Sequence, residues 1–176
     1  MTRIENVIIY LLSRAKQKGK DNLSKTELFK LLYLLEVESY KFTGRTFFDS
    51  TVAFVRDKNG PISVAIYRAL SDLDNEYIRI EEKKKEDYPH ARHCISIKKD
   101  IKKFNLQDSE KLFINSILES YLTLTIGRLK SVAYNTEPMK EIQKEEKRSK
   151  KSVLKGHQLD FSLIPLDEDI VDLIAG

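Results

Sequence analysis

Three histidines and one cysteine are the residues from which a metal site or a catalytic thiol would have to be built. His90 and His93 are three positions apart, and residues at that spacing on a strand face opposite sides of it. His93 and Cys94 are adjacent and diverge in the same way, whereas a cysteine nucleophile needs an imidazole beside its thiolate. No spacing connects His157 with the other two histidines. We therefore expect no metal ion and no catalytic cysteine, and we interpret the histidines as exposed loop residues.

Other patterns that support catalysis are also missing from the sequence. No serine lies in a nucleophile-elbow pattern, and no glycine-rich loop is present to bind phosphate. The dipeptide Gly60-Pro61 is not such a loop, because proline removes one of the amides that the loop must present. The carboxylates of Glu81 and Glu82 lie in a charged stretch and are interpreted as solvated. We expect a protein that is not an enzyme and needs no cofactor. An unrecognised hydrolase would require a pocket with clustered polar groups of perturbed acidity.

The basic stretch 140–155 is the feature that favours nucleic-acid binding. The net charge of +4 permits weak attraction to phosphates. The candidate contacts are Lys140, Lys144, Arg148 and Lys151. Glutamates are interleaved with these residues at helical spacing, which is typical of a solvated helix with internal ion pairs. A nucleic-acid-binding regulator of its own operon is therefore the alternative function.

The elements that would position functional residues are centred on the stretch 24–67. Ser24-Lys25-Thr26-Glu27 is a capping box, in which the Ser24 hydroxyl accepts from the Glu27 amide and the Glu27 carboxylate reaches back to Ser24. Leucines at the spacing of one helix face follow, and aromatic residues widen the stripe, so we expect a helix buried on most sides. Gly44 ends it, because glycine enters the left-handed conformation at little cost. This helix lacks the polar face that a DNA-recognition helix needs.

A strand and a second helix are predicted after Gly44. The stretch from Thr51 to Arg56 is rich in β-branched and aromatic residues and suits a short strand. Asn59-Gly60-Pro61 is predicted to be a turn that opens a helix, with Pro61 at the first helical position, where proline is tolerated. The apolar side of this helix is formed by Ile62, Ala65, Ile66, Ala69, Leu70 and Leu73.

The other elements flank this centre. The apolar spacing predicts a helix over 3–18 with a capping box of Thr2 and Glu5, and strands over 76–81 and 93–98 that pair around a solvated loop, 83–87. A helix capped by Asp108 or Ser109 follows. Its inward side is predicted to include Leu112, Phe113, Ile117, Tyr121 and Leu124.

The last third of the chain is predicted to hold a short helix, a charged helix and a docked tail. Gly127 precedes the short helix through 129–133, which ends at Glu137-Pro138 because the residue before proline avoids the helical region. The stretch 139–151 is highly charged. The tail from His157 to Leu173, with Ile170 within it, returns to apolar character and should dock on the body.

Composition sets the class of protein. The chain has 176 residues, of which 41% are hydrophobic and 33% charged, and this predicts one globular domain over 1–176. Its core covers about 4–145, and a charged helix and docked tail cover about 139–176. The expected fold is α+β, mainly α, a compact helical domain with a small antiparallel sheet or hairpin. No apolar run approaches the roughly 18 residues that span a bilayer, and the N-terminus has no signal-peptide pattern. A single cysteine fits a reducing cytoplasm, so we expect a cytoplasmic protein that does not bind membranes.

Three segments then follow one another in a recognisable order: the lysine- and leucine-rich helix 25–35, the aromatic-rich segment 47–67 around Gly60-Pro61, and the stretch 129–139, which ends in Thr136-Glu137-Pro138-Met139. Together they resemble the Panacea domain, the family of SocA-like antitoxins and phage-associated proteins. The resemblance covers roughly residues 4–145. The sequence departs from the family pattern at Met139, where an aromatic residue is usual, and at Asn135-Thr136, which replaces a Thr-His pair.

The resemblance implies a compact, mainly helical bacterial antitoxin that binds a cognate toxin protein and neutralises it. In one branch of the family such a protein instead acts as an adaptor that delivers its toxin to a protease complex. The family pattern contains no catalytic residue, and it specifies neither the toxin nor the oligomeric state.

We predict that the partner surface forms around the Gly60-Pro61 turn and the motif 134–139, because tyrosine, methionine and proline there could form an anchor cluster with a charged rim. The predicted partner-binding residues are Gly60, Pro61, Tyr67, Tyr134, Glu137, Pro138 and Met139. The alternative is that Gly60 and Pro61 only shape a turn and that the two tyrosines only fill the core.

Overall fold

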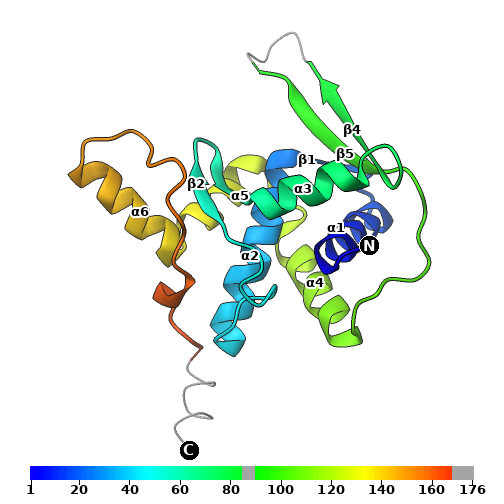
Figure 1. Cartoon of the computed structure of the whole chain (residues 1–176), viewed down its shortest axis with the longest axis horizontal. Helices are drawn as coiled ribbons and strands as arrows, with labels where there is room; N and C mark the ends of the chain where they lie inside the picture. Colours follow the sequence, from blue (N-terminus) through cyan, green and yellow to red (C-terminus); the bar gives the residue numbers. More distant parts are fainter. Residues whose placement is uncertain (85–89, 168–176) are drawn as a thin grey trace, which may run out of the picture. The chain divides into compact units, whose positions relative to one another are not determined.

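The computed structural model describes residues 1–84 and 90–167 of the chain. Its fold is α+β and mainly helical, as predicted, with small antiparallel sheets. The chain divides into two compact units. The first unit consists of Met1–Leu31 and Ile66–Thr123, and the second consists of Leu32–Ala65 and Leu124–Gly176. Figure 1 labels their helices and strands.

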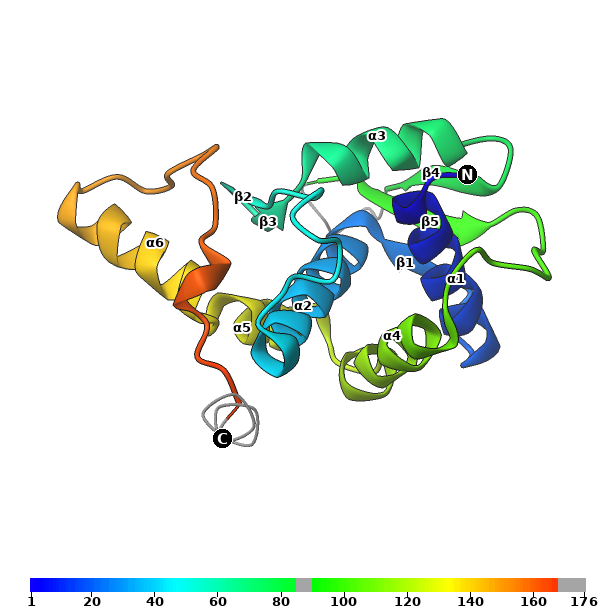
Figure 2. The same cartoon turned by 60° about the horizontal axis from the view of Figure 1, so that its bottom comes forward.

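Helices α1 (Arg3–Gln17) and α4 (Asp108–Tyr121) pack against each other in the first unit (Figures 1 and 2). The predicted capping box of α1 is confirmed, because the Thr2 amide donates to Glu5 Oε2 over 2.8 Å and the Glu5 amide donates to Thr2 Oγ1 over 3.3 Å. The predicted apolar face of α1 is buried.

The inward side predicted for α4 is wrong at Leu112, whose exposed fraction is 71%. Ile114, Ile117 and Leu118 are the buried residues of this helix. Ile117 belongs both to the predicted apolar stripe and to the stripe with Ile114 and Leu118 that is buried. Helical spacing alone does not show which of the two stripes faces the core. The cap also differs, since Glu110 Oε2 accepts from the Gln107 amide one position before the predicted caps.

The first unit also holds a three-stranded antiparallel sheet. Its strands are β1 (Asn22–Ser24), β4 (Ile78–Lys83) and β5 (Arg92–Ile97), in the order β1-β5-β4. The predicted hairpin is confirmed, with Ile80 opposite Ile95. Strand β1 was not predicted, because three residues are too short to show a period. Of the predicted loop 83–87, residues 85–87 lie outside the described residues.

Helix α2 (Lys25–Thr43) begins in the first unit and continues in the second. Its capping box is confirmed, because the Ser24 amide donates to Glu27 Oε2 over 2.8 Å and the Glu27 amide donates to Ser24 Oγ over 3.2 Å. The helix is buried on most sides, as predicted. Gly44 follows its last residue with φ of +69°, the left-handed conformation expected of it.

The turn at Gly60-Pro61 does not open a helix, and that prediction is wrong. Strands β2 (Val55–Asp57) and β3 (Gly60–Ile62) form a hairpin in which Arg56 lies opposite Pro61. Asp57 and Gly60 are the pair that closes this two-residue hairpin, and the next pair, Arg56 and Pro61, is not hydrogen-bonded in an antiparallel ladder. Proline lacks an amide hydrogen, so at this position no hydrogen bond of the hairpin is lost. Gly60 has φ of +115°, a conformation that glycine adopts readily.

The neighbouring predictions change accordingly. The predicted strand is shorter and later than 51–56, since residues 51–54 precede β2. Helix α3 (Val64–Leu73) begins after Ser63, and its buried residues are Ile66, Ala69, Leu70 and Leu73.

Two helices of the second unit follow the predicted pattern. Helix α5 (Ile126–Tyr134) is capped by Thr125, whose hydroxyl accepts from the Arg128 amide. A break between two helices is confirmed, but it lies at 135–136 and not at Glu137-Pro138, since α5 ends at Tyr134. Helix α6 (Glu137–Arg148) includes Glu137, the residue before proline, and Pro138 lies in its first turn, where proline is tolerated.

The tail docks in the second unit as far as it is described. Residues 156–159 run antiparallel to β2, with Gln158 opposite Val55. Leu159 and Ile164 are buried, and the short 3-10 helix η1 (Phe161–Leu163) lies beside α6 (Figure 2). The predicted contacts of Ile170 and Leu173 fall on positions outside the described residues.

Candidate partner-binding site

Four of the predicted partner-binding residues are buried in the second unit. Gly60 and Pro61 lie in β3, and Pro138 and Met139 lie in the first turn of α6. Met139 has no exposed surface. These four residues therefore belong to the interior of the unit.

The other three predicted residues keep accessible surface, but not all in one unit. Tyr134 and Glu137 are half-buried in the second unit. Tyr67 belongs to the first unit and is 40% exposed. Its ring centroid lies 4.6 Å from that of Phe29, and the Lys25 ammonium lies 5.4 Å from the Tyr67 ring.

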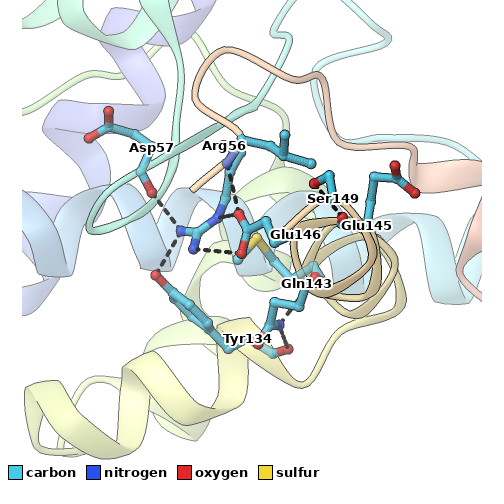
Figure 3. Close-up of polar contacts among 9 residues, drawn as sticks. Arg56, Asp57, Tyr134, Gln143, Glu145, Glu146 and Ser149 are labelled. Carbon is cyan, nitrogen blue, oxygen red and sulfur yellow. Dashed lines mark hydrogen bonds and ion pairs between the residues drawn. The ribbon is translucent and has the colours of Figure 1, made fainter. Parts of the chain in front are cut away.

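A buried ion pair joins Arg56 of β2 and Glu146 of α6 in the second unit (Figure 3). Arg56 Nε donates to Glu146 Oε1 over 2.8 Å, and Arg56 Nη1 donates to the Asp57 carbonyl over 2.6 Å. The Leu154 amide donates to the same Oε1 over 3.0 Å. One carboxylate thus holds the hairpin, α6 and the backbone at Leu154 together.

Tyr134 completes this arrangement from α5. Its hydroxyl accepts from Arg56 Nη1 over 2.9 Å, and the Arg56 guanidinium carbon lies 5.1 Å from the ring centroid. The Lys130 ammonium lies 5.2 Å from the same centroid. Two cations therefore lie within cation–π distance of one ring, which fixes its orientation.

The pair stays charged despite its burial. Burial disfavours the Glu146 carboxylate, but hydrogen bonds from Arg56 and the Leu154 amide outweigh burial, so the pKa of Glu146 lies below its ordinary value of 4.5. Burial likewise disfavours the Arg56 cation, yet hydrogen bonds to Glu146 and Tyr134 raise the pKa of Arg56. The site is therefore a fixed pair of opposite charges at neutral pH.

Two further hydrogen bonds attach α6 and its cap to their surroundings. Gln143 Nε2 donates to the Tyr134 carbonyl of α5 over 3.0 Å, and it also donates to the Met139 carbonyl within α6 over 3.1 Å. The Tyr33 hydroxyl of α2 is hydrogen-bonded to Thr136 Oγ1 over 2.7 Å. The motif 134–139 is thus a joint between α5, α6 and α2.

Sequence reasoning did not find Arg56 or Glu146. Arg56 is a charged residue at the end of an apolar stretch, and Glu146 is one of several glutamates in α6. Their separation of 90 residues leaves no local spacing that links them. The weak signal was an arginine in a stretch otherwise suited to burial.

A model of the family described as antitoxin SocA-like, Panacea domain, matches residues 28–140, which is more than half of the chain. The chain belongs to this family. No curated protein matches the chain. The Panacea match begins inside α2 and ends in the first turn of α6, so Arg56 and Tyr134 lie within it and Glu146 lies beyond it.

The four residues considered for nucleic-acid contact lie in or just after α6, at and beyond the end of the Panacea match. Lys140, Lys144 and Arg148 each pair with the glutamate three positions earlier, and Lys151 is exposed. The N–O distances are 3.1 Å to Glu137, 3.7 Å to Glu141 and 3.9 Å to Glu145. This is the solvated helix with internal ion pairs that the sequence suggested.

Among the described residues, the side chains of the three histidines and of Cys94 take no part in the contacts of the Arg56–Glu146 ion pair. His93 and Cys94 are neighbours on β5 in the first unit, where His93 is exposed and Cys94 half-buried. His90 is exposed, and His157 is exposed in the tail. Within 1–84 and 90–167, no group of three His, Cys, Asp or Glu residues is arranged to hold a metal ion. In the same ranges, we find no helix with the length and apolarity to traverse a lipid bilayer.

Proposed function

We propose that this protein is a non-catalytic antitoxin that binds a cognate toxin protein and neutralises it by direct contact in the bacterial cytoplasm. The observation that carries the proposal is the Panacea match over 28–140, because the family is one of antitoxins. Delivery of the bound toxin to a protease complex is the adaptor form of the same proposal, since it also begins with a specific complex.

The geometry of the second unit supports a binding role. Arg56, Glu146 and Tyr134 hold β2, α5 and α6 in fixed positions with buried, charged hydrogen bonds. A surface that is rigid before binding loses little conformational entropy when a partner docks. Such a scaffold suits recognition of a folded protein.

The first experiment is co-expression with the product of the neighbouring reading frame. We expect that product to arrest growth when expressed alone and growth to recover when the present chain is expressed with it. The same strain carrying a chain with Arg56→Ala, which removes the buried cation, should not recover. Growth arrest that the wild-type chain never relieves would count against the antitoxin role.

The second experiment separates binding from catalysis. Purified chain is titrated into purified toxin, and the remaining toxin activity is measured. Neutralisation by binding predicts that activity falls in proportion to added chain and ends near an equimolar ratio. Inactivation of excess toxin by a small fraction of the chain would show turnover and would contradict the non-catalytic proposal.

A further inference from the structure

A cavity of about 590 Å³ opens on the surface of the second unit. Residues from the end of α2 and the following loop, 40–54, form one side, and tail residues 158–162 form the other. We call this cavity the tail groove. Its volume lies within the range of about 300–1,000 Å³ that binding pockets occupy.

The tail groove has an aromatic lining. Phe54 and Phe161 both contribute to it, with ring centroids 6.4 Å apart. Tyr33 supports them from α2, at 5.4 Å from Phe54 and 5.8 Å from Phe161. Phe54 and Tyr33 are fully buried, so the lining is backed by the core of the unit.

Two extended backbone segments meet at one end of the tail groove and separate along it. The Arg56 amide donates to the His157 carbonyl over 2.8 Å, and the Leu159 amide donates to the Phe54 carbonyl over 2.9 Å. Beyond this pairing, the amides of Ala53 and Gln158 have no acceptor among residues 1–84 and 90–167, and both residues are exposed. Both residues also line the tail groove, where an added strand could use such donors.

The loop beside these donors is held in an unusual conformation. Asp49 and Ser50 line the tail groove and have consecutive positive φ angles of 49° and 64°. Neither residue is glycine, and backbone in this region costs of order 1–3 kcal/mol per residue. The Ser50 amide donates to Thr46 Oγ1 over 3.0 Å, which helps to hold the turn. Strain of this kind is concentrated at binding sites in proteins.

We propose that the tail groove binds an extended segment of the partner toxin, which places one apolar side chain against the half-buried Phe161 and pairs its backbone with the exposed Ala53. The inference rests on the proposed antitoxin function and names the surface and the chemistry of the partner. The chain's own tail shows that this edge accepts an extended strand, because 156–159 already pairs with β2. Addition of a strand at an exposed edge is a common way to bind a peptide.

The charges around the tail groove favour an uncharged segment. One basic residue, Arg45, and two acidic residues, Asp49 and Asp160, line it, so both signs of charge are present. A polyanion or a strongly basic segment would meet repulsion at one side or the other. The Panacea match ends at Lys140, so residues 40–54 of the tail groove lie within it and residues 158–162 lie outside it.

The test uses linear peptides of about ten residues displayed on phage and selected against the full chain. Ala53→Trp fills the tail groove from one side, and Ser162→Trp fills it from the other. Both positions are exposed, so the substitutions leave the core intact. Ser152→Trp, at an exposed position of the same unit outside the tail groove, is the matched control.

We expect selected peptides to share one apolar residue within an uncharged stretch. They should bind wild type and Ser152→Trp equally, and both groove variants at least about tenfold more weakly. Hydrogen exchange at Ala53 should slow when peptide binds, because its amide gains an acceptor. Absence of selected peptides, equal binding by Ala53→Trp, or unchanged exchange at the Ala53 amide would overturn the proposal.

Neutralisation of the toxin in co-expression separates this inference from the function on which it rests. Wild type and Ser152→Trp should restore growth, and Ala53→Trp and Ser162→Trp should not. If all four restore growth, the antitoxin function stands and the tail groove is not its interface. If none restores growth, the proposed function fails, while the peptide measurements still decide whether the tail groove binds an extended segment.

Discussion

Each unit contains a buried carboxylate held by a basic side chain, and the two arrangements differ in how far apart their members lie in the sequence. In the first unit, Glu27 accepts from the Ser24 amide and from Lys20 Nζ over 2.8 and 2.6 Å. All three residues lie within eight consecutive positions. In the second unit, Glu146 accepts from Arg56, which is 90 residues away.

The difference shows what each carboxylate stabilises. Glu27 completes a capping box and stabilises the start of one helix, so its effect is largely local. Glu146 connects the β2–β3 hairpin with α6 and with the backbone at Leu154. The hairpin is far from the other two segments along the chain. A local arrangement forms with its helix, whereas the distant one forms only when the unit is folded. We therefore expect the second to contribute more to tertiary structure and the first to be easier to predict.

The largest effect should come from Glu146→Ala. It leaves Arg56 as a buried cation without its carboxylate, and breaking a buried pair in this way costs about 3–5 kcal/mol. The free energy of unfolding, measured in urea by circular dichroism, should fall by that amount.

A double variant tests whether the cost comes from the orphaned charge. Arg56→Met combined with Glu146→Leu replaces both charges with apolar side chains, and it should recover most of the lost free energy. A double variant that is less stable than Glu146→Ala would show that the hydrogen bonds of Arg56 to Asp57 and Tyr134 matter more than the pair itself.

The next effect is the response to acid. Burial opposes ionisation of Glu27, but hydrogen bonds from Lys20 and Ser24 outweigh it, so the pKa of Glu27, like that of Glu146, lies below 4.5. A lowered pKa in the folded state stabilises the protein above pH 4.5, and this stabilisation is lost as the pH falls from 4.5 through the lowered value. The loss should be smaller than that of Glu146→Ala, because a protonated carboxyl keeps its volume.

The pH dependence can be divided between the two units by substitution. Glu146→Gln should flatten part of the decline of the unfolding free energy between neutral pH and pH values below 4.5, and Glu27→Gln should flatten a further part. Urea unfolding at a series of pH values measures both slopes. A Glu146→Gln variant as steep as wild type would mean that this carboxylate does not titrate with folding.

Ser24→Ala should have an effect of about 1 kcal/mol on the free energy of unfolding, the usual cost of losing a helix cap. The substitution removes the hydroxyl that accepts from the Glu27 amide and donates to Glu27 Oε2 over 2.7 Å. The backbone amide of residue 24 and Lys20 still hold the carboxylate. Ser24→Ala as damaging as Glu146→Ala would contradict the distinction between local and distant arrangements.

The same distinction explains which parts of the fold the sequence predicted. The capping boxes at Thr2 and Ser24 and the helix end at Gly44 were predicted correctly, because their determinants lie within a few residues of one another. The β4–β5 hairpin was also predicted, from alternation in both strands.

Features that depend on tertiary contact were not predicted. Pro61 was assigned to a helix because its preference for a first helical position is a local rule, whereas its pairing with Arg56 in a hairpin follows from packing. Leu112 was assigned to the core because helical spacing admits two stripes on α4. The Arg56–Glu146 pair and the tail groove, which joins 40–54 with 158–162, have no signal in any short window.

The smallest effect should be found in the exposed pair of Lys144 and Glu141, three positions apart on α6. Their N–O distance is 3.7 Å, and their side chains are 63% and 52% exposed. A double-mutant cycle with alanine at each position should give a coupling of about 0.2–0.5 kcal/mol. In about 1 M NaCl the Debye length is about 3 Å, so this coupling should vanish.

The Arg56–Glu146 coupling should persist in the same salt, because water and ions are excluded from a buried pair. Equal salt sensitivity of the two couplings would show that the pair in the second unit is hydrated in solution, and its role as the joint between β2 and α6 would have to be abandoned.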